Sequence, residues 1–228
     1  MINKQNIGQI LCELPGHVQL VAAAKTREPQ EILDAINAGV KIIGENYVQE
    51  AERAFNIVGN KVQWHFIGHL QKNKVKKAVE IFDMIETVDS PEIAEEIDKR
   101  SAQAGKIMPV LIEINSGREA SKTGVQPDNA EQMITSLATL KNIRVSGLMT
   151  MGPATEKPDD IRPYFRETKK LFDNLKNLAI PGADMKYLSM GMTDSYQIAI
   201  QEGANIVRIG SKIFGERDRT FAKEYRCD

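Results

Sequence analysis

Residues 186–215, KYLSMGMTDSYQIAIQEGANIVRIGSKIFG, hold one complete unit of a pattern that runs through the whole chain. An apolar run comes first, a segment with helical spacing that ends at a glycine follows, and a second apolar run with β-branched residues completes the unit. Parallel strands that are buried on both faces carry such runs, and a helix usually joins one strand to the next. We therefore interpret this stretch as a strand, a helix and a second strand of a parallel sheet.

The same alternation covers the 228 residues of the chain. Ser90-Pro91-Glu92 is typical of a helix start, because a serine cap is followed by proline at the first helical position. Apolar residues at steps of three and four predict buried helix faces at Ile32, Leu33 and Ile36; at Ile93 and Ile97; at Met133, Ile134, Leu137 and Leu140; and at Phe165, Leu171, Phe172, Leu175 and Leu178. The strand candidates are residues 19–26, 41–47, 62–70, 84–90, 108–116, 144–152, 186–193 and 205–215.

Polar residues near the ends of these candidates favour a closed sheet over an open one. In a barrel the carboxyl ends of the strands converge on one mouth where active sites are built, whereas in a doubly wound open sheet they spread along an edge. We therefore predict an α/β fold, a (β/α)8 TIM barrel that forms a single domain over residues 1–228, with the doubly wound sheet as the alternative. The polar residues are Lys25, Asn46, His69, Asn115, Thr150, Ser189 and Arg208.

Composition limits the kinds of partner. The formal net charge of -1 provides no overall field for nucleic acid or an anionic membrane, so we expect a small-molecule ligand. The N-terminus lacks the apolar core of a signal peptide, and no apolar run approaches the ~20 residues of a membrane span. Cys12 and Cys227 show neither metal-ligand spacing nor a disulfide framework. We expect a cytoplasmic protein with reduced thiols and no metal site.

Lys25 follows three alanines in an apolar run, and this position allows two interpretations. The lysine could simply mark where the chain leaves the core for solvent. Alternatively, a low-dielectric environment could disfavour its ammonium form and free the amine, which is how lysines become Schiff-base nucleophiles.

The last two predicted strands end in turns of small residues. Ser189, Gly191 and Thr193 follow one strand, and Gly210 and Ser211 follow the other. Backbone N–H groups and hydroxyls in such turns suit an anion, and barrels frequently bind phosphate with the loops after strands seven and eight. We therefore expect a phosphate site there, although such residues also form ordinary loops.

Arg208 lies within an otherwise apolar run, so its guanidinium should face the interior or the mouth of the barrel and needs a partner there. The partner could be a carboxylate such as Glu45 or Glu113, or an acceptor on a bound ligand.

Six segments together resemble the pyridoxal phosphate homeostasis protein family, which is itself similar to the N-terminal barrel of alanine racemases: VAAAKT, IGENYVQE, WHFIGHLQKNK, GLMTMGP, LSMGMTDSY and VRIGSKIFG. The resemblance implies that pyridoxal 5'-phosphate (PLP) is attached covalently to Lys25 as a Schiff base. It also implies that Arg208 meets the pyridine nitrogen and that Asn46 lies near the ring. The remaining cofactor-binding residues that it implies are Met151, Ser189, Gly191, Met192, Gly210 and Ser211.

Two departures from the racemase pattern argue against catalysis. In the racemase pattern a tyrosine follows the Schiff-base lysine by four positions, and here that position holds Pro29. We also expect the segment after the eighth strand to be too short for the second domain of racemases. We expect no catalytic residues and a monomer that holds PLP and makes it available to PLP-dependent apoenzymes. A racemase-like enzyme is the alternative, and it would need a second acid or base such as Tyr47 or Tyr196. A lysine-dependent aldolase is a more distant possibility.

The loop NSGREASKTG, residues 115–124, is long enough to cover the barrel mouth. We take a flexible loop without chemistry as the default. As a hypothesis, Lys122 meets phosphate during cofactor entry or release.

Overall fold

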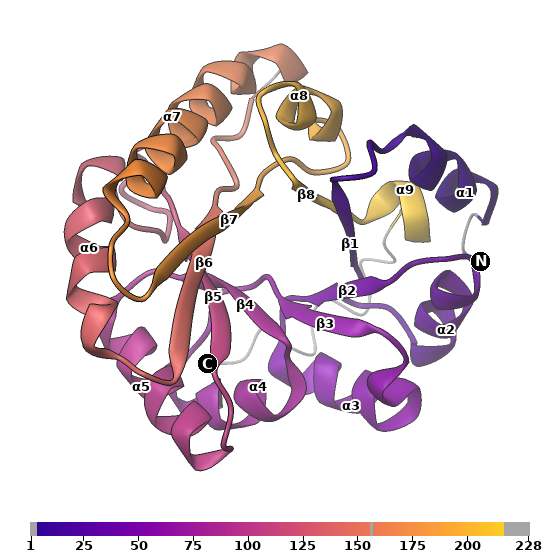
Figure 1. Ribbon diagram of the computed structural model, residues 1–228. Coiled ribbons are helices and arrows are strands. Elements are labelled where there is room, and N and C mark those ends of the chain that lie inside the picture. Colours follow the sequence, from indigo (N-terminus) through magenta and orange to yellow (C-terminus); the bar gives the residue numbers. More distant parts are fainter. Residues whose placement is uncertain (1–3, 156, 217–228) are drawn as a thin grey trace.

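The computed structural model describes residues 4–155 and 157–216, in which eight parallel strands form a closed barrel in chain order (Figure 1). Closure is direct, because Val21 of the first strand lies opposite Arg208 of the last. The prediction of a TIM barrel is confirmed and the open sheet is excluded. Cys227 and the predicted boundary at residue 228 lie outside the described residues. The strands are β1 (Gln19–Ala23), β2 (Ile42–Glu45), β3 (Gln63–Phe66), β4 (Met84–Val88), β5 (Met108–Glu113), β6 (Ile143–Met149), β7 (Ala183–Ser189) and β8 (Ile206–Ile209).

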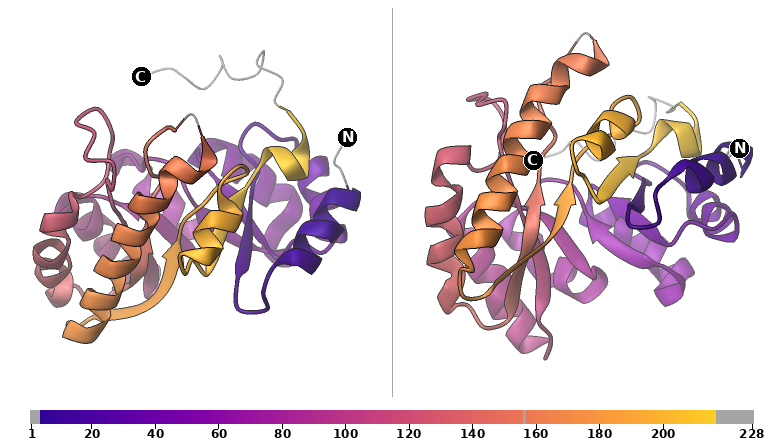
Figure 2. Two further views of the ribbon diagram at one scale, coloured as in Figure 1. Left: turned by 90° about the horizontal axis from the view of Figure 1, so that it is seen from above. Right: turned by 45° about the horizontal axis from the view of Figure 1, so that its top comes forward.

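Helices surround the strands on the outside of the barrel, as the views in Figures 1 and 2 show. None of the helices in the described part of the chain combines the length and the apolar character that crossing a membrane requires. The α-helices are α1 (Lys4–Glu13), α2 (Pro29–Asn37), α3 (Val48–Val58), α4 (Val75–Ile81), α5 (Pro91–Gln103), α6 (Ala130–Ser136), α7 (Arg162–Leu178), α8 (Tyr196–Gln201) and α9 (Ser211–Phe214). Short 3-10 helices occur at η1 (Gly59–Lys61), η2 (Lys72–Lys74), η3 (Pro127–Asn129), η4 (Leu137–Thr139) and η5 (Pro158–Ile161).

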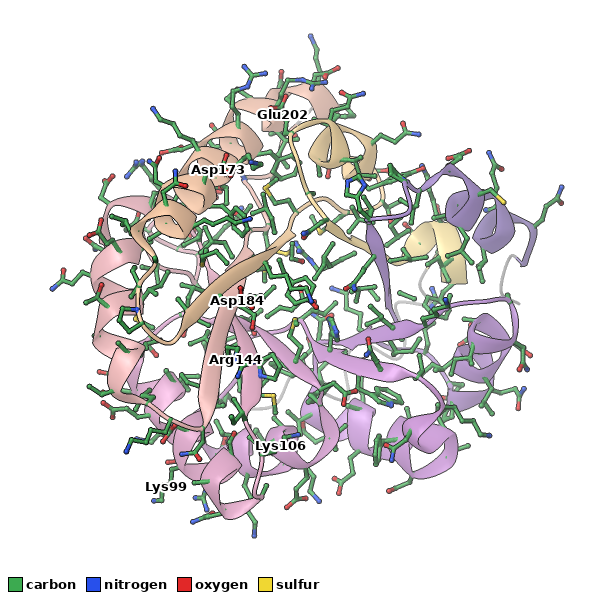
Figure 3. The ribbon with its side chains drawn as sticks, viewed as in Figure 1. Lys99, Lys106, Arg144, Asp173, Asp184 and Glu202 are labelled. Atoms are coloured by element: carbon green, nitrogen blue, oxygen red, sulfur yellow. The ribbon has the colours of Figure 1, made fainter. Side chains whose placement is uncertain are left out.

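Most of the strands are buried on both faces, because alternate side chains face the barrel interior and the helix layer; β7 is the exception, with Asp184 and Lys186 exposed. Val21, Ile42, Ile67 and Ile206 form a small interior cluster. Leu20 belongs instead to the large core between sheet and helices. Figure 3 shows side chains occupying the space that the strands enclose. The double burial explains why the strands read as nearly continuous apolar runs.

The strands end earlier than the sequence predicts. Residue 23 is the last of β1, so Lys25 stands in the turn that follows it. Thr26 has a φ of 65°, which no strand can accommodate. After β8 the chain turns at Gly210 into α9 instead of remaining extended to residue 215. The polar residues expected at strand ends therefore stand on the loops at the barrel mouth.

The predicted helix faces are largely confirmed. Ser90 is the N-cap of α5 and Pro91 its first residue, while Ile93 and Ile97 are buried. Leu178 is an exception, since 51% of its surface is exposed. It is the last residue of α7, and the next residue turns into the left-handed conformation that ends the helix, so the expected face does not extend to this position.

The turn after β1 contacts the C-terminal part of the described chain beside the mouth. Arg27 Nη2, in the turn after β1, donates a 2.6 Å hydrogen bond to the carbonyl of Gly215, 188 positions later. The Arg27 guanidinium also lies 5.7 Å from the ring centroid of Phe214 in α9. These contacts attach α9 to the turn that carries Lys25.

Candidate ligand site at the mouth of the barrel

Lys25 is held at the mouth by a constrained turn. Ala24 N–H donates to the carbonyl of Gly44 (2.9 Å), so pairing with β2 persists up to the residue before the lysine. Thr26 N–H then donates to Glu50 Oε2 of α3 (2.8 Å). A β-branched residue at positive φ is unusual and costs roughly 1–3 kcal/mol, so the surrounding contacts must fix it. Lys25 itself is half-buried.

Arg208 leads into a chain of buried polar contacts across the barrel interior. Its Nη1 donates to Ser189 Oγ (2.6 Å), and its Nη2 donates to the carbonyl of Thr150 (2.8 Å). The hydroxyl of Ser189 in turn donates to Glu86 Oε2 (2.6 Å). His65 Nδ1 lies 2.7 Å from Glu86 Oε1, which accepts its hydrogen bond. Four side chains from β3, β4, β7 and β8 thus form one connected network, which we call the interior network.

The interior network decides the ionisation of its members. Burial alone would raise the pKa of Glu86, but the hydrogen bond and charge of His65, the charge of Arg208 and the hydrogen bond of Ser189 outweigh it, so the pKa is lowered. Burial lowers the pKa of Arg208, and the negative charges of Glu86 and Glu113 oppose that effect. Both residues are almost completely buried. An ionised carboxylate in this position is therefore stabilised by its partners.

Neither of the carboxylates named as possible partners of Arg208 hydrogen-bonds to it, although the negative charge of Glu113 acts on it. Its side-chain hydrogen bonds go to Ser189, Thr150 and the sulfur of Met151 (3.6 Å), and neither Glu45 nor Glu113 is among them. Glu45 follows Gly44, which faces the interior, so the alternation of β2 directs the carboxyl of Glu45 toward the helices.

Glu86, and the role of His65 as its partner, were not predicted from the sequence. The sequence did contain an indication of this network. His65 and Glu86 are titratable residues in apolar runs that predict buried strands, and buried titratable groups need partners.

The two turns predicted to bind phosphate lie side by side. Ser211 Oγ lies 3.1 Å from Thr193 Oγ1, and Gly210 N–H donates to the same threonine oxygen (3.4 Å). Gly191 has a φ of 89° and its carbonyl accepts from Arg208 N–H (3.0 Å). Any Cβ at Gly191 would come within 2.6 Å of the Ala199 Cβ, so this turn requires glycine.

The predicted site residues thus gather at one end of the barrel. Met151 and Ser189 contact Arg208 directly, and Gly191 does so through its backbone. The hydroxyl of Ser189 is fully engaged in the interior network. Its assignment to phosphate, like that of Gly191, Met192, Gly210 and Ser211, stays a prediction.

A cavity of ≈ 550 Å³ opens at the same end. Asn46, Met151 and Met192 are among its lining residues, whereas Lys25 and Arg208 are not. The side-chain oxygen of Asn46 is buried and has no hydrogen-bond partner among the described residues. A buried acceptor without a partner marks a position where a ligand or water would supply one. The described residues contain no group of three or more histidine, cysteine, aspartate or glutamate side chains placed to hold a metal ion.

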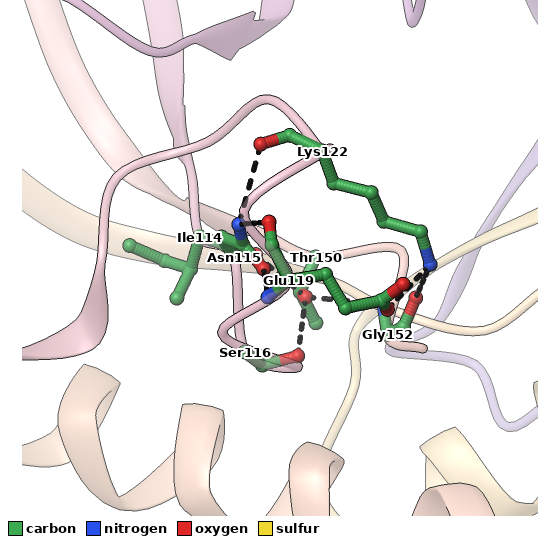
Figure 4. Close-up of polar contacts among 7 residues, drawn as sticks. All are labelled: Ile114, Asn115, Ser116, Glu119, Lys122, Thr150 and Gly152. Atoms are coloured by element: carbon green, nitrogen blue, oxygen red, sulfur yellow. Dashed lines mark hydrogen bonds and ion pairs between the residues drawn. The ribbon is translucent and has the colours of Figure 1, made fainter. Parts of the chain in front are cut away.

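Residues of the loop 115–124 line this cavity, and Figure 4 shows the polar contacts that this loop makes. Asn115 Nδ2 donates to the carbonyls of Glu119 (2.8 Å) and Lys122 (3.3 Å), which folds the loop on itself. Lys122 Nζ donates to Glu119 Oε1 (2.7 Å) and to the Gly152 carbonyl (3.5 Å). The lysine is therefore engaged at the rim, and its expected contact with phosphate stays a prediction.

The two tyrosines considered as a second acid or base differ in their surroundings. Tyr196 OH donates to Glu13 Oε2 of α1 (3.3 Å), and Lys212 Nζ lies 4.8 Å from its ring centroid. Burial, with Glu13 nearby, raises the pKa of this tyrosine. Tyr47 is the N-cap of α3 and is partly exposed. Tyr196 therefore belongs to the contact between α8 and α1.

Comparison with known proteins agrees with this architecture. Residues 4–218 match the family model described as alanine racemase, N-terminal domain. Alanine racemase of Clostridium difficile 630 superposes with a TM-score of 0.76 at 16% identity, covering 93% of this chain and 55% of the racemase, which shows the shared fold alone. The fold and the family model therefore define a barrel of the alanine racemase N-terminal type.

Relatives with higher sequence identity identify the family within this fold class. The pyridoxal phosphate homeostasis protein of Aquifex aeolicus (strain VF5) is 42% identical over 217 residues, covering 92% of this chain and 93% of the relative. PipY of Synechococcus elongatus PCC7942 superposes with a TM-score of 0.88 without PLP, at 30% identity, covering 93% of this chain and 99% of PipY. A second PipY structure, at 29% identity, has PLP bound. The chain belongs to the pyridoxal phosphate homeostasis protein family.

Proposed function

We propose that this protein binds PLP at the barrel mouth through a covalent bond from Lys25, and that it holds the cofactor for PLP-dependent apoenzymes. One observation carries the proposal: Lys25 stands in a fixed turn at the end of β1, on the same mouth as Arg208 and the two turns around Gly191 and Gly210. The names of the relatives and the PLP in PipY support it.

The residues at the mouth fit such a ligand. Small residues lie around the lysine, because alanines precede it and Gly210 projects no side chain toward the Ala23 carbonyl. The unpartnered Asn46 oxygen is available to a donor on that ring. Bound PLP would supply an aldehyde that condenses reversibly with an amine.

Arg208 would determine what chemistry the bound ring favours. A guanidinium has donors only and cannot accept a proton in return, so it prefers an unprotonated pyridine nitrogen. Its contacts to Ser189 and Thr150 hold it in place for that role. An unprotonated ring is a weaker electron sink, which suits storage of the cofactor better than carbanion chemistry.

We infer from this that the protein is not an enzyme of amino-acid turnover. Tyr196 is engaged with Glu13, so it is not positioned as a base opposite Lys25. Exchange of amino-acid α-protons in deuterated water would contradict this part of the proposal if it occurred rapidly in PLP-loaded protein. The monomeric state, the cytoplasmic location and the identity of recipient apoenzymes stay predictions.

The central test is borohydride reduction of the PLP-treated protein, followed by peptide mass mapping. We expect one PLP adduct on Lys25 in the wild type and its loss in Lys25→Ala. Lys41→Ala is the matched control, because Lys41 is exposed and precedes β2 at the opposite end of the barrel. An unmodified Lys25 in PLP-saturated protein would refute the proposal.

A further inference from the structure

Two glutamates, at the end of β2 and the start of α3, lie near the turn that carries Lys25. Glu45 ends β2 and only 1% of its surface is exposed, and Glu50 lies in the first turn of α3. Each has one side-chain oxygen that is buried and without a hydrogen-bond partner among the described residues, namely Glu45 Oε2 and Glu50 Oε1. Lys25 interacts electrostatically with both carboxyls. We call Glu45 and Glu50 the carboxyl pair.

The members of the carboxyl pair have different surroundings. Glu50 Oε2 accepts the hydrogen bond from Thr26 N–H, and Arg53 of the same helix lies near enough to favour its charged form. For Glu45, the groups that favour the charged form are the backbone N–H of Asn46, which donates a hydrogen bond, and Lys25, whose positive charge has a weaker effect. Burial raises the pKa of both groups, and it raises that of Glu45 much further, with the negative charge of Glu50 as a second cause. Glu45 is therefore the member whose carboxyl ionises less readily.

We propose that the carboxyl pair controls Lys25 in two ways: Glu50 positions the amine through Thr26 and provides the single negative charge beside it, while Glu45 stays neutral. This inference deepens the proposed function, on which its biological meaning rests. One nearby carboxylate stabilises the ammonium moderately, whereas two would hold the proton on Lys25 more firmly and slow its reaction with an aldehyde.

Other charged groups near the turn are already engaged. Arg27 Nη1 lies 3.4 Å from Glu31 Oε1, and its Nη2 donates to Gly215. Arg53 acts on Glu50 from α3. Arg53 therefore joins Glu45 and Glu50 among the charged groups near the Lys25 turn.

The test measures Lys25 in the ligand-free protein, so it does not depend on PLP. Competitive acetylation with acetic anhydride across a pH series, read by peptide mass spectrometry, gives the midpoint at which the Lys25 amine becomes reactive. Glu50→Gln removes the charge but keeps an oxygen for Thr26, and we expect the midpoint to fall by about one pH unit or more. Glu45→Gln should move it less than half as far. Glu52→Gln is the matched control, because Glu52 is exposed on α3 and pairs with Lys77.

The positioning part has its own readout. In Glu50→Ala the Thr26 amide loses its acceptor, so its hydrogen exchange should accelerate at least tenfold, whereas Glu50→Gln should retain protection. An unchanged Lys25 midpoint in Glu50→Gln, an equal shift in Glu45→Gln, or a protected Thr26 amide in Glu50→Ala would each overturn the inference. If PLP failed to bind Lys25 while these shifts were observed, only the proposed function would fail.

Discussion

Glu45 and Glu86 occupy comparable positions and behave in opposite ways. Glu45 stands on β2 and Glu86 on β4, with β3 between them, and 1% and 0% of their surfaces are exposed. Glu86 lies in the interior network, where His65 and Ser189 contact both of its oxygens, and its pKa is lowered. Glu45 lies toward the helix layer with one oxygen unpartnered, and its pKa is raised. The two carboxyls are buried to nearly the same extent, so their different partners account for the opposite directions of their pKa shifts.

The difference indicates what each region contributes. A charged group that is buried together with its partners lowers the stability of the fold little while the network is complete. Removing one member destabilises the fold strongly, because a buried charge is left without a partner. A buried acid with few partners leaves no buried charge behind when it is replaced, and its raised pKa makes stability fall as pH rises. We therefore expect the interior network to act on stability and the carboxyl pair to act on ionisation at the mouth.

The largest effect should follow removal of Glu86. Glu86→Leu leaves Arg208 and His65 without their carboxylate, and we expect a loss of about 3–5 kcal/mol in the free energy of unfolding. Urea denaturation followed by circular dichroism measures it. Glu45→Leu is the comparison, with an expected loss below about 1.5 kcal/mol. Equal losses in the two variants would remove the distinction between the regions.

A smaller loss should follow Ser189→Ala. The hydroxyl connects Arg208 Nη1 to Glu86 Oε2, so its removal leaves a donor and an acceptor unpaired, at an expected cost of about 1–3 kcal/mol. Ser136→Ala is a control on the periphery, where the hydroxyl bonds only to the Met133 carbonyl. If both variants unfolded at the same urea concentration as the wild type, the interior network would contribute no stability.

The pH dependence of stability should differ in sign between the two glutamates. Because the folded pKa of Glu86 is lowered, its contribution is present above the unfolded value of about 4.3 and is lost as pH falls through the folded value. Because the folded pKa of Glu45 is raised, stability falls as pH rises above about 4.3 toward the folded value.

The matching glutamine variants isolate these contributions when the pH series runs from below the folded pKa of Glu86 up to about pH 8. Glu86→Gln should have a lower free energy of unfolding than wild type at neutral pH, and this difference should disappear toward low pH. Glu45→Gln should gain on the order of 1 kcal/mol over wild type toward high pH. Parallel curves for wild type and Glu45→Gln would show that Glu45 titrates normally.

The smallest effect is expected at the exposed rim. Glu119 also pairs with a cation, Lys122, at 2.7 Å, but both side chains are more than a third exposed. Glu119→Gln should change the free energy of unfolding by less than about 0.5 kcal/mol, because solvent screens such pairs. A loss comparable to that of Glu86→Leu would mean that exposure does not separate the two kinds of pair.

The sequence predicted the barrel well because its signals are local. Eight apolar runs, their order and the polar residues near their ends were sufficient, and Arg208 was correctly expected to be buried. Its partners were not predictable in the same way. Ser189 and Glu86 are 103 positions apart, and a single sequence does not reveal which strands bring them together. The state of Glu45 also depends on the absence of a second partner, which only the folded arrangement shows.

The bond from Arg27 to the carbonyl of Gly215 has a consequence for biosynthesis. Two residues 188 positions apart cannot meet until the ribosome has released nearly all of the described chain. At translation rates of roughly 5–20 residues per second, the N-terminal strand waits on the order of ten seconds or longer for its closing neighbour. During that interval the nascent polypeptide has a lysine but no assembled mouth around it.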